Sequence, residues 1–288
     1  MPILTALLLA ALTFALAAPV PRALAQARWP YKNPGLALAL WQAIALSGGL
    51  TLIATIFFIA QSFDIFALQL FFGLIGTFIF GWLIYVLFRE IALNKKERDK
   101  HKHLLYLLTE ESPDNTRILD YETPVAYCLP GIRSKVTVLS RGLLTSLDPY
   151  ELDAVRKHED AHLNQYHHLL TTAFSAWRKS ITGLPSAKMA QQQVATLIEI
   201  LADRNATKYY NPRLVAQALV NTAGTSMNPL RKPNVQYVET IPTAERIKAL
   251  LTPPEPLPLA QKIAVIGIII LLLAIPFASY IILYLRQG

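Results

Sequence analysis

The stretch AVRKHEDAHLNQYHH, from Ala154 to His168, carries the most specific pattern in this chain. It contains HEDAH, in which His158 and His162 are four residues apart and therefore lie on one face of a helix. Two imidazoles placed in this way can bind one metal ion. Glu159 lies about 100° around the helix from His158, so its carboxylate can reach a water on that ion without binding the ion. The pattern is typical of a zinc hydrolase.

The residues just before this stretch predict the start of its helix. Asp148 suits the N-cap, Pro149 suits the first helical position, and Glu151 gives a pattern close to a capping box. Leu152 and Val155 then give the helix a buried side. The alternative is that the two histidines only solvate the face of an ordinary helix, because so short a pattern also arises by chance.

A catalytic zinc usually has three protein ligands and one open position, and a third candidate follows downstream. The segment ATLIEILADRNATKY, residues 195–209, reads as a helix in which Glu199 and Asp203 share a face. Glu199 would complete a His, His, Glu site, and Asp203 is placed to accept the free N–H of a liganding imidazole. Acidic pairs on helices are mostly solvated, which is the alternative. Here the surrounding residues are markedly apolar, and an unpaired carboxylate among them would be costly.

Three segments carry a family resemblance: AYCLPGIRSKVTVLSRGLLTSL (126–147), LDPYELDAVRKHEDAHL (147–163) and EILADRNA (199–206). They resemble the BlaR/MecR family of membrane metallopeptidases, the beta-lactam sensor-transducers and their relatives. The resemblance implies a gluzincin-like zinc endopeptidase with Glu199 as the third zinc ligand. It also implies signal-dependent cleavage of a cytoplasmic transcriptional repressor, and self-cleavage. The sequence ends at Gly288, so we expect a short form without the penicillin-binding domain and do not carry over beta-lactam sensing.

The composition indicates a membrane protein, since 53% of the 288 residues are hydrophobic and 16% are charged. The net charge is +8, but residues 89–258 hold 22 Lys+Arg and 18 Asp+Glu, a balance of only +4. We therefore expect no direct nucleic-acid binding and attribute the excess of basic residues to membrane flanks. The lone cysteine, Cys128, excludes an internal disulfide framework.

Four apolar runs are long enough to cross a bilayer: Pro2–Val20, Leu36–Ala60, Ile65–Phe88 and Ile263–Leu285. Basic residues follow the first and third runs, so we expect the amino terminus outside and residues 90–258 in the cytoplasm, at the plasma membrane. The alternative for the first run is a signal peptide, with Ala23-Leu24-Ala25 as a cleavage site. The expected segments are 1–34 and 35–88 for the first three spans with their loop, 89–258 for the peptidase domain, and 259–288 for the last span.

Three strands are expected before the histidine helix: Arg117–Tyr121, Val125–Leu129 and Val136–Ser140. The predicted fold class is therefore α+β, with about four transmembrane helices and a domain of helices plus a small sheet. By analogy with other zinc peptidases, an edge strand would hold the extended substrate, which makes Ala126, Tyr127, Cys128 and Val138 candidates for substrate binding. The alternative is that these residues belong to ordinary core strands.

The remaining histidines are expected to lie away from the metal. His101 and His103 should face lipid headgroups, and His167 and His168 fall off the face shared by the HEDAH pair, where they would contact headgroups, water or substrate. The group that stabilises the oxyanion is left open among Tyr209, Tyr210, His167 and an arginine. The segment Arg246–Pro258 is either a stiff spacer or a regulator of activity.

Together these features predict an integral membrane zinc endopeptidase that holds one Zn²⁺ per chain through His158, His162 and Glu199, with Glu159 as the catalytic base and Asp203 behind a ligand. Its partners would be the lipid bilayer and a protein substrate. A second reading is a membrane quality-control protease like the HtpX-type or CAAX-processing enzymes. A third is a non-catalytic membrane adaptor that keeps the metal site for structural support.

Overall fold

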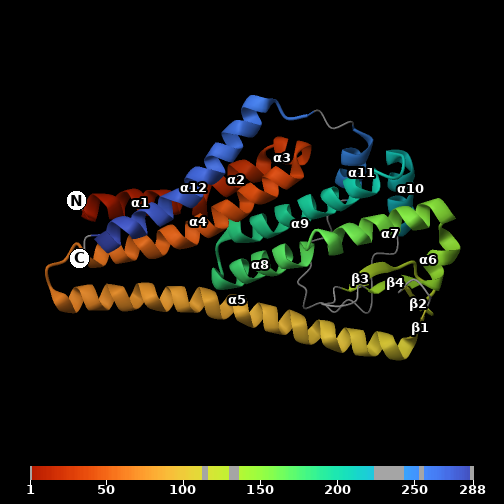
Figure 1. The fold of residues 1–288 in the computed structure, drawn as a ribbon, viewed down its shortest axis with the longest axis horizontal. Coiled ribbons are helices and arrows are strands. Elements are labelled where there is room, and N and C mark those ends of the chain that lie inside the picture. The colour runs from red at the N-terminus through yellow and green to blue at the C-terminus, as the bar shows by residue number, and fades with distance from the viewer. Residues whose placement is uncertain (1, 112–115, 130–135, 224–242, 253–255, 286–288) are drawn as a thin grey trace. The chain divides into compact units, whose positions relative to one another are not determined.

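The computed structural model describes residues 2–111, 116–129, 136–223, 243–252 and 256–285. These residues form twelve helices and four strands (Figure 1), which confirms the prediction of helices with a small sheet. The chain divides into two compact units. The first comprises Met1–Glu90, Ala173–Val194 and Pro256–Gly288, and the second comprises Ile91–Thr172 and Ala195–Glu255.

The first unit is entirely helical in its described part. It contains α1 (Pro2–Ala17), α2 (Pro19–Gln26), α3 (Trp29–Lys32), α4 (Pro34–Ala60), α12 (Leu259–Leu285) and adjoining parts of α5 (Phe66–Leu108), α8 (His167–Ser180) and α9 (Pro185–Ala206). Four helical segments are long and apolar enough to cross a membrane, as predicted: Pro2–Gln26, Pro34–Ala60, Phe66–His101 and Leu259–Ile281. The chain therefore has the helices of a membrane protein.

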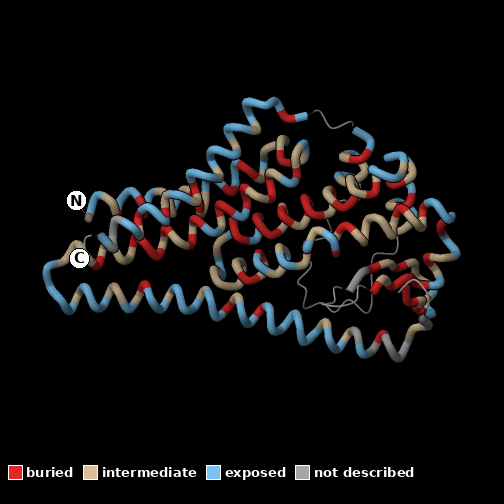
Figure 2. The backbone as a smooth tube through the Cα atoms, viewed as in Figure 1, coloured by how far each residue is buried: buried red, intermediate tan, exposed pale blue. Residues whose placement is uncertain are grey.

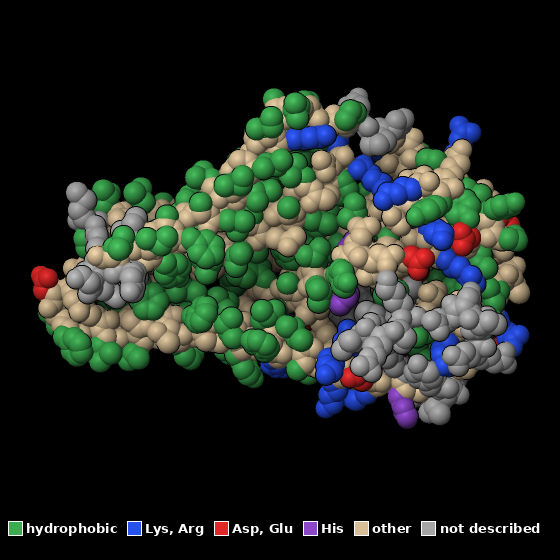
Figure 3. Space-filling model, viewed as in Figure 1, with side chains coloured by type: hydrophobic (Ala, Val, Ile, Leu, Met, Phe, Trp, Pro, Cys, Tyr) green, Lys and Arg blue, Asp and Glu red, His purple; other side chains and the backbone are tan. Residues whose placement is uncertain are grey.

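Large apolar side chains cover the outside of this unit. Phe78 is 73% exposed, and Phe71 and Ile270 are also exposed. Figure 2 shows exposed residues along most of α5 and α12, whereas α4 is largely buried. Figure 3 shows hydrophobic side chains covering the visible face of these helices. Exposed apolar surface on this scale fits contact with lipid rather than with water.

The hydroxyls of Thr13 and Thr51 have hydrogen-bond partners within the unit. Thr13 Oγ1 on α1 donates to Thr51 Oγ1 on α4 at 2.9 Å, and Thr51 Oγ1 donates to the carbonyl oxygen of Ser47 at 2.8 Å. A hydroxyl in an apolar environment needs such a partner, so these residues favour the packing of α1 against α4.

Two features of the helices differ from the sequence expectations. α5 continues without a break from the apolar run through the basic stretch to Leu108, because residues 82–108 contain neither glycine nor proline. Residues 173–194, expected within a peptidase domain at 89–258, pack with the first unit. The expected segment boundaries remain predictions.

The second unit contains a four-stranded sheet in the order β1-β2-β4-β3. The strands are β1 (Thr109–Glu111), β2 (Thr116–Leu119), β3 (Ala126–Leu129) and β4 (Val136–Ser140). β2 and β4 are parallel, whereas the pairs β1–β2 and β3–β4 are antiparallel. The three expected strands are thus present within two residues, and β1 is an addition that the sequence reading missed.

The chain between the sheet and the histidine helix is fixed by one serine and one glycine. Ser140 Oγ accepts hydrogen bonds from the backbone N–H groups of Val125 and Leu143, which caps α6 (Arg141–Ser146). A Cβ atom on Gly142 would lie 1.7 Å from the carbonyl oxygen of Glu122, so this position accepts only glycine.

α7 (Pro149–Asn164) starts with the predicted capping box. Asp148 Oδ1 accepts from the backbone N–H groups of Tyr150 and Glu151, and Glu151 Oε2 accepts from the backbone N–H of Asp148. The other oxygen of Glu151 accepts from Asn221 Nδ2 on α10 (Pro212–Ala223) at 3.1 Å. The first turn of α7 is therefore fixed both within the helix and to its neighbour.

A small core holds α7, α9, α10 and α11 (Thr243–Leu251) together. Ala154 of α7 and Ala206 of α9 are completely buried beside Val215, Ala216 and Leu250. This cluster joins α7 and α9 to α10 and α11 within the second unit.

We predict that Gly142→Ala destabilises the protein, because the clash involves the backbone of Glu122 and cannot be relieved by a side-chain rotation. The expected cost is about 1–3 kcal/mol or more, measured as a lower thermal unfolding midpoint of the purified protein in detergent. Gly81→Ala on α5, where no atom lies within 4 Å of the added Cβ, is the control and should leave the midpoint unchanged. Equal midpoints for the two variants would contradict this prediction.

Candidate metal centre

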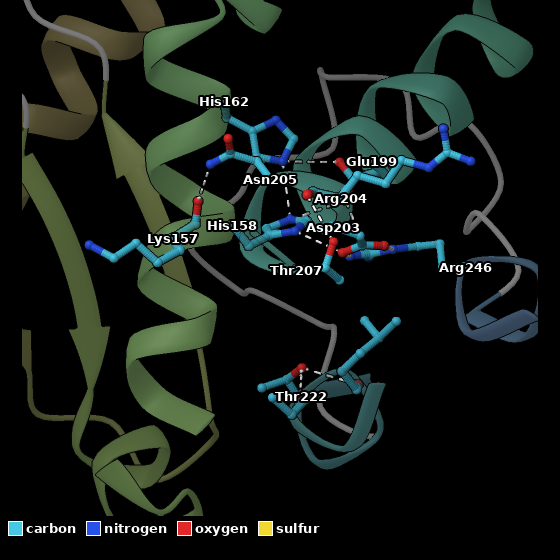
Figure 4. Close-up of polar contacts among 12 residues, drawn as sticks. Lys157, His158, His162, Glu199, Asp203, Arg204, Asn205, Thr207, Thr222 and Arg246 are labelled. Carbon is cyan, nitrogen blue, oxygen red and sulfur yellow. Dashed lines mark hydrogen bonds and ion pairs between the residues drawn. The ribbon is translucent and has the colours of Figure 1, made fainter. Parts of the chain in front are cut away.

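Two helices of the second unit supply the candidate ligands. α7 carries His158 and His162 one turn apart, and α9 carries Glu199 and Asp203 one turn apart. Asn205 Nδ2 donates to the carbonyl oxygen of Lys157 at 3.3 Å and links the two helices beside these residues (Figure 4). The four side chains therefore face one another across the contact between α7 and α9.

The donor atoms of His158, His162 and Glu199 form a compact triangle. The two Nε2 atoms are 3.1 Å apart, His158 Nε2 lies 3.5 Å from Glu199 Oε2, and His162 Nε2 lies 3.6 Å from Glu199 Oε1. These three residues can hold a metal ion. Tetrahedral ligand atoms of one zinc ion are about 3.3 Å apart, so the separations fit zinc.

Asp203 lies behind this triangle. Its Oδ1 is 2.8 Å from His158 Nδ1, the ring nitrogen opposite the one that faces Glu199. A histidine that uses Nε2 for a metal carries its proton on Nδ1, and Asp203 can accept that proton in a hydrogen bond. The role of Asp203 behind a metal ligand remains a prediction.

Arg246, on α11, is a further residue of the site that the sequence reading did not single out. Its Nε donates to Asp203 Oδ2 at 2.8 Å, its Nη2 donates to Asp203 Oδ1 at 2.6 Å, and its Nη1 lies 3.2 Å from Glu199 Oε2. The side chain of Asp203 is only 3% exposed. One guanidinium thus compensates two acidic side chains of the site, one of which is fully buried.

These contacts shift the ionisation of the group as a whole. Burial opposes charge on His158, but the carboxylates of Asp203 and Glu199 raise its pKa to about 10. Burial also opposes charge on Glu199 and Asp203. Even so, His162, His158 and Arg246 hold the pKa of Glu199 well below its usual value, and Arg246 and His158 lower the pKa of Asp203. The two carboxylates are therefore charged at neutral pH, as a metal ligand and a proton acceptor must be.

Glu159, the predicted base, is half-buried on α7 between the two histidines in sequence. Burial lowers the pKa of Arg246, but Asp203, Glu199 and also Glu159 raise it above its ordinary value. The carboxylate of Glu159 therefore acts on the same guanidinium as the other two. Its role as a base remains a prediction.

The expectation that His167 contacts headgroups, water or substrate is wrong, because its side chain is buried. His167 is 2% exposed, and its Nδ1 lies 3.1 Å from Nδ1 of His162. The prediction assumed that one helix runs through His167, but α7 ends at Asn164 and Tyr166 adopts a left-handed conformation with φ 51°. Burial, together with the neighbouring His162, lowers the pKa of His167 to about 4. His168 is half-buried and does not belong to the metal cluster.

The other residues considered from the sequence have different partners. Tyr210 donates from its hydroxyl to Asp153 Oδ2 at 2.6 Å, and Lys157 Nζ lies 5.3 Å from the centre of the Tyr209 ring. His101 Nε2 lies 3.1 Å from the hydroxyl oxygen of Tyr127, so His101 faces the sheet, whereas His103 is exposed. No described contact brings either tyrosine to the metal ligands.

The strand candidates for substrate binding separate into two groups. β3, which holds Ala126, Tyr127 and Cys128, is at the edge of the described sheet and packs beside α7. β4 lies between β2 and β3, and the side chain of Val138 is completely buried, so the expectation that β4 provides an edge does not fit the observed order. The side chain of Cys128 lies outside the described residues. Substrate binding by any of the four remains a prediction.

The site combines an HExxH helix with a third candidate metal ligand, in a chain that has four helices apolar enough to span a membrane. Residues 109–196 match the sequence model of Peptidase family M48, which supports a membrane metallopeptidase. The matched region contains His158, Glu159 and His162 and ends before Glu199. No curated protein and no solved structure matches the chain.

We predict that the protein purified in detergent contains one zinc ion per chain, because its three donors have the separations of a zinc site. Elemental mass spectrometry measures the content directly. His162→Ala should lose the metal, while His103→Ala on the exposed side of α5 should keep it. If the folded wild-type protein contains no metal, the proposed ligand set is wrong and the adaptor interpretation is favoured.

We predict that Arg246→Met destabilises the protein by about 3–5 kcal/mol, because it removes the guanidinium that pairs with the buried Asp203 carboxylate. The control is Arg213→Met on the exposed surface of α10, which should change stability by less than about 0.5 kcal/mol. Chemical unfolding in detergent, followed by circular dichroism, measures both. Similar losses in the two variants would show that Arg246 does not compensate these carboxylates.

Proposed function

We propose that this chain is an integral membrane zinc endopeptidase that hydrolyses peptide bonds of a cytoplasmic protein. The observation that carries the proposal is the triangle of His158 Nε2, His162 Nε2 and Glu199 oxygens, with separations of 3.1–3.6 Å. The match to Peptidase family M48 supports it, as do the four apolar helices. Structural zinc sites are usually closed and rich in cysteine, whereas this set leaves a coordination position open.

The residues of the site have separate roles in the proposed hydrolysis. Zinc held by His158, His162 and Glu199 would supply a Lewis acid that lowers the pKa of water and polarises the scissile carbonyl. Glu159 takes the proton of the attacking water and passes it to the leaving amine. Asp203 holds the Nδ1–H of His158 and so fixes the ring orientation, and Arg246 keeps Asp203 charged and in place.

The substrate is proposed to bind as an additional strand on β3. This strand has an open edge in the described sheet and lies beside α7, where Ala126 packs near Leu152 and Val155. Backbone hydrogen bonds along an edge strand hold a peptide in an extended conformation. In an extended peptide a protease can reach one peptide bond, and this depends little on the side chains of the substrate.

The cytoplasmic location of the site and a repressor as substrate belong to the same proposal. Six Lys/Arg against three Asp/Glu in residues 89–103, directly after the third apolar run, support a cytoplasmic second unit at the plasma membrane. The BlaR/MecR resemblance of residues 126–163 and 199–206 supports a DNA-binding repressor as substrate and self-cleavage as a further step.

The test of the mechanism is Glu159→Gln, which removes the base but keeps the size of the side chain. We expect unchanged zinc content and a loss of about 10²–10⁴-fold in casein hydrolysis by the full chain in detergent. Asp160→Asn, the neighbouring position on α7, is the matched control and should retain both zinc and activity. Wild-type rates in Glu159→Gln would remove Glu159 from its role.

The same variant identifies the substrate. Expressed in cells with a photo-crosslinker at Ala126, inactive Glu159→Gln protein should trap uncleaved substrate on β3. Recovery of one DNA-binding protein would support the repressor, and recovery of many membrane proteins would support the quality-control interpretation instead.

A further inference from the structure

The two histidine ligands differ in what supports them from behind. His158 has Asp203 at its Nδ1 atom, whereas Nδ1 of His162 faces Nδ1 of His167 at 3.1 Å. The rings of His162 and His167 are 5.0 Å apart and nearly perpendicular, at 81°. Each of the two histidines thus has its own partner at Nδ1, on the side away from Glu199. The partner of His162 is another imidazole.

We propose, on the basis of the zinc site proposed above, that His167 is the positioning residue of His162. His162 presents Nε2 to Glu199 and to His158, so a metal at that atom requires the proton of the neutral ring to be on Nδ1. The atom within hydrogen-bond distance is Nδ1 of His167, which must then be unprotonated and accept. His167 therefore fixes both the tautomer and the orientation of His162.

The local backbone holds His167 in this place. α7 ends at Asn164, Tyr166 takes the left-handed conformation, and α8 begins directly with His167. The backbone N–H of Tyr166 donates to the carbonyl oxygen of Leu163, and the N–H of Leu169 donates to that of Tyr166. The tight reversal turns the side chain of His167 back against α7, where it is 2% exposed.

Two observations exclude other uses of this ring. His167 contacts the Nδ1 edge of His162, opposite the edge that faces Glu199, so it is not a fourth ligand at the triangle. Its own Nε2 is buried and has no hydrogen-bond partner among the described residues. Within the described part of the chain, the hydrogen-bond partner of the His167 ring is therefore His162.

The test compares substitutions that keep or remove the acceptor at the position of Nδ1. The amide oxygen of asparagine falls near that position, leucine keeps the volume without an acceptor, and glutamine places its oxygen further out. The dissociation constant for zinc is measured on the full chain in detergent by competition with a chelator. His167→Leu and His167→Gln should weaken zinc binding by about 10- to 100-fold, and His167→Asn by less than about threefold.

His168→Leu is the control, because His168 is adjacent but lies outside the metal cluster, and it should bind zinc like the wild type. Circular dichroism verifies that each variant is folded. If His167→Leu does not fold, the zinc affinities of His167→Asn and His167→Gln are compared instead. Equal affinity in that pair, or wild-type affinity in His167→Leu, would reduce His167 to a packing residue and leave the proposed peptidase intact. A wild-type protein that binds no zinc would overturn both.

Discussion

Two acidic side chains of α9 lie against two histidines of α7 in a partly buried site, and the second unit depends on this pairing. A buried carboxylate is tolerated only if charged or hydrogen-bonding partners surround it. Asp203 meets this requirement with His158 on one side and Arg246 on the other, and Glu199 meets it with both histidines and the same arginine. The polar groups therefore hold one another in place. A metal site needs such preorganised ligands before any ion binds.

The rest of the second unit supports that contact by local means. The capping box at Asp148 and Glu151 fixes where α7 begins, and Gly142 allows the chain to pass close to the backbone of Glu122 just before it. Ala154 of α7 and Ala206 of α9 share one buried cluster. β3 packs on α7 and lies at the edge of the described sheet.

The first unit also contains paired polar side chains, although its surface is apolar. Two pairs of polar side chains meet inside it: Thr13 with Thr51, and Glu90 with Lys179 at 2.7 Å. Glu90 is 2% exposed, so this ion pair ties α5 to α8 within the unit. α8 and α9 each contribute residues to both units, so α9, which carries Glu199, begins in the first unit and ends in the second.

The sequence by itself determined the features that depend on neighbouring residues: the helical spacing of His158 and His162, the capping box, the apolar spans and three of the four strands. It also placed Glu199 and Asp203 on one helical face, because residues four positions apart in a helix lie on the same side. Only the tertiary structure decided which distant groups meet. It brought Arg246 to Asp203, turned His167 inward through the left-handed Tyr166, and made β4 central by pairing it in parallel with β2. Such contacts depend on how helices and strands pack and on single backbone angles. Neither of these produces a periodic pattern in the sequence.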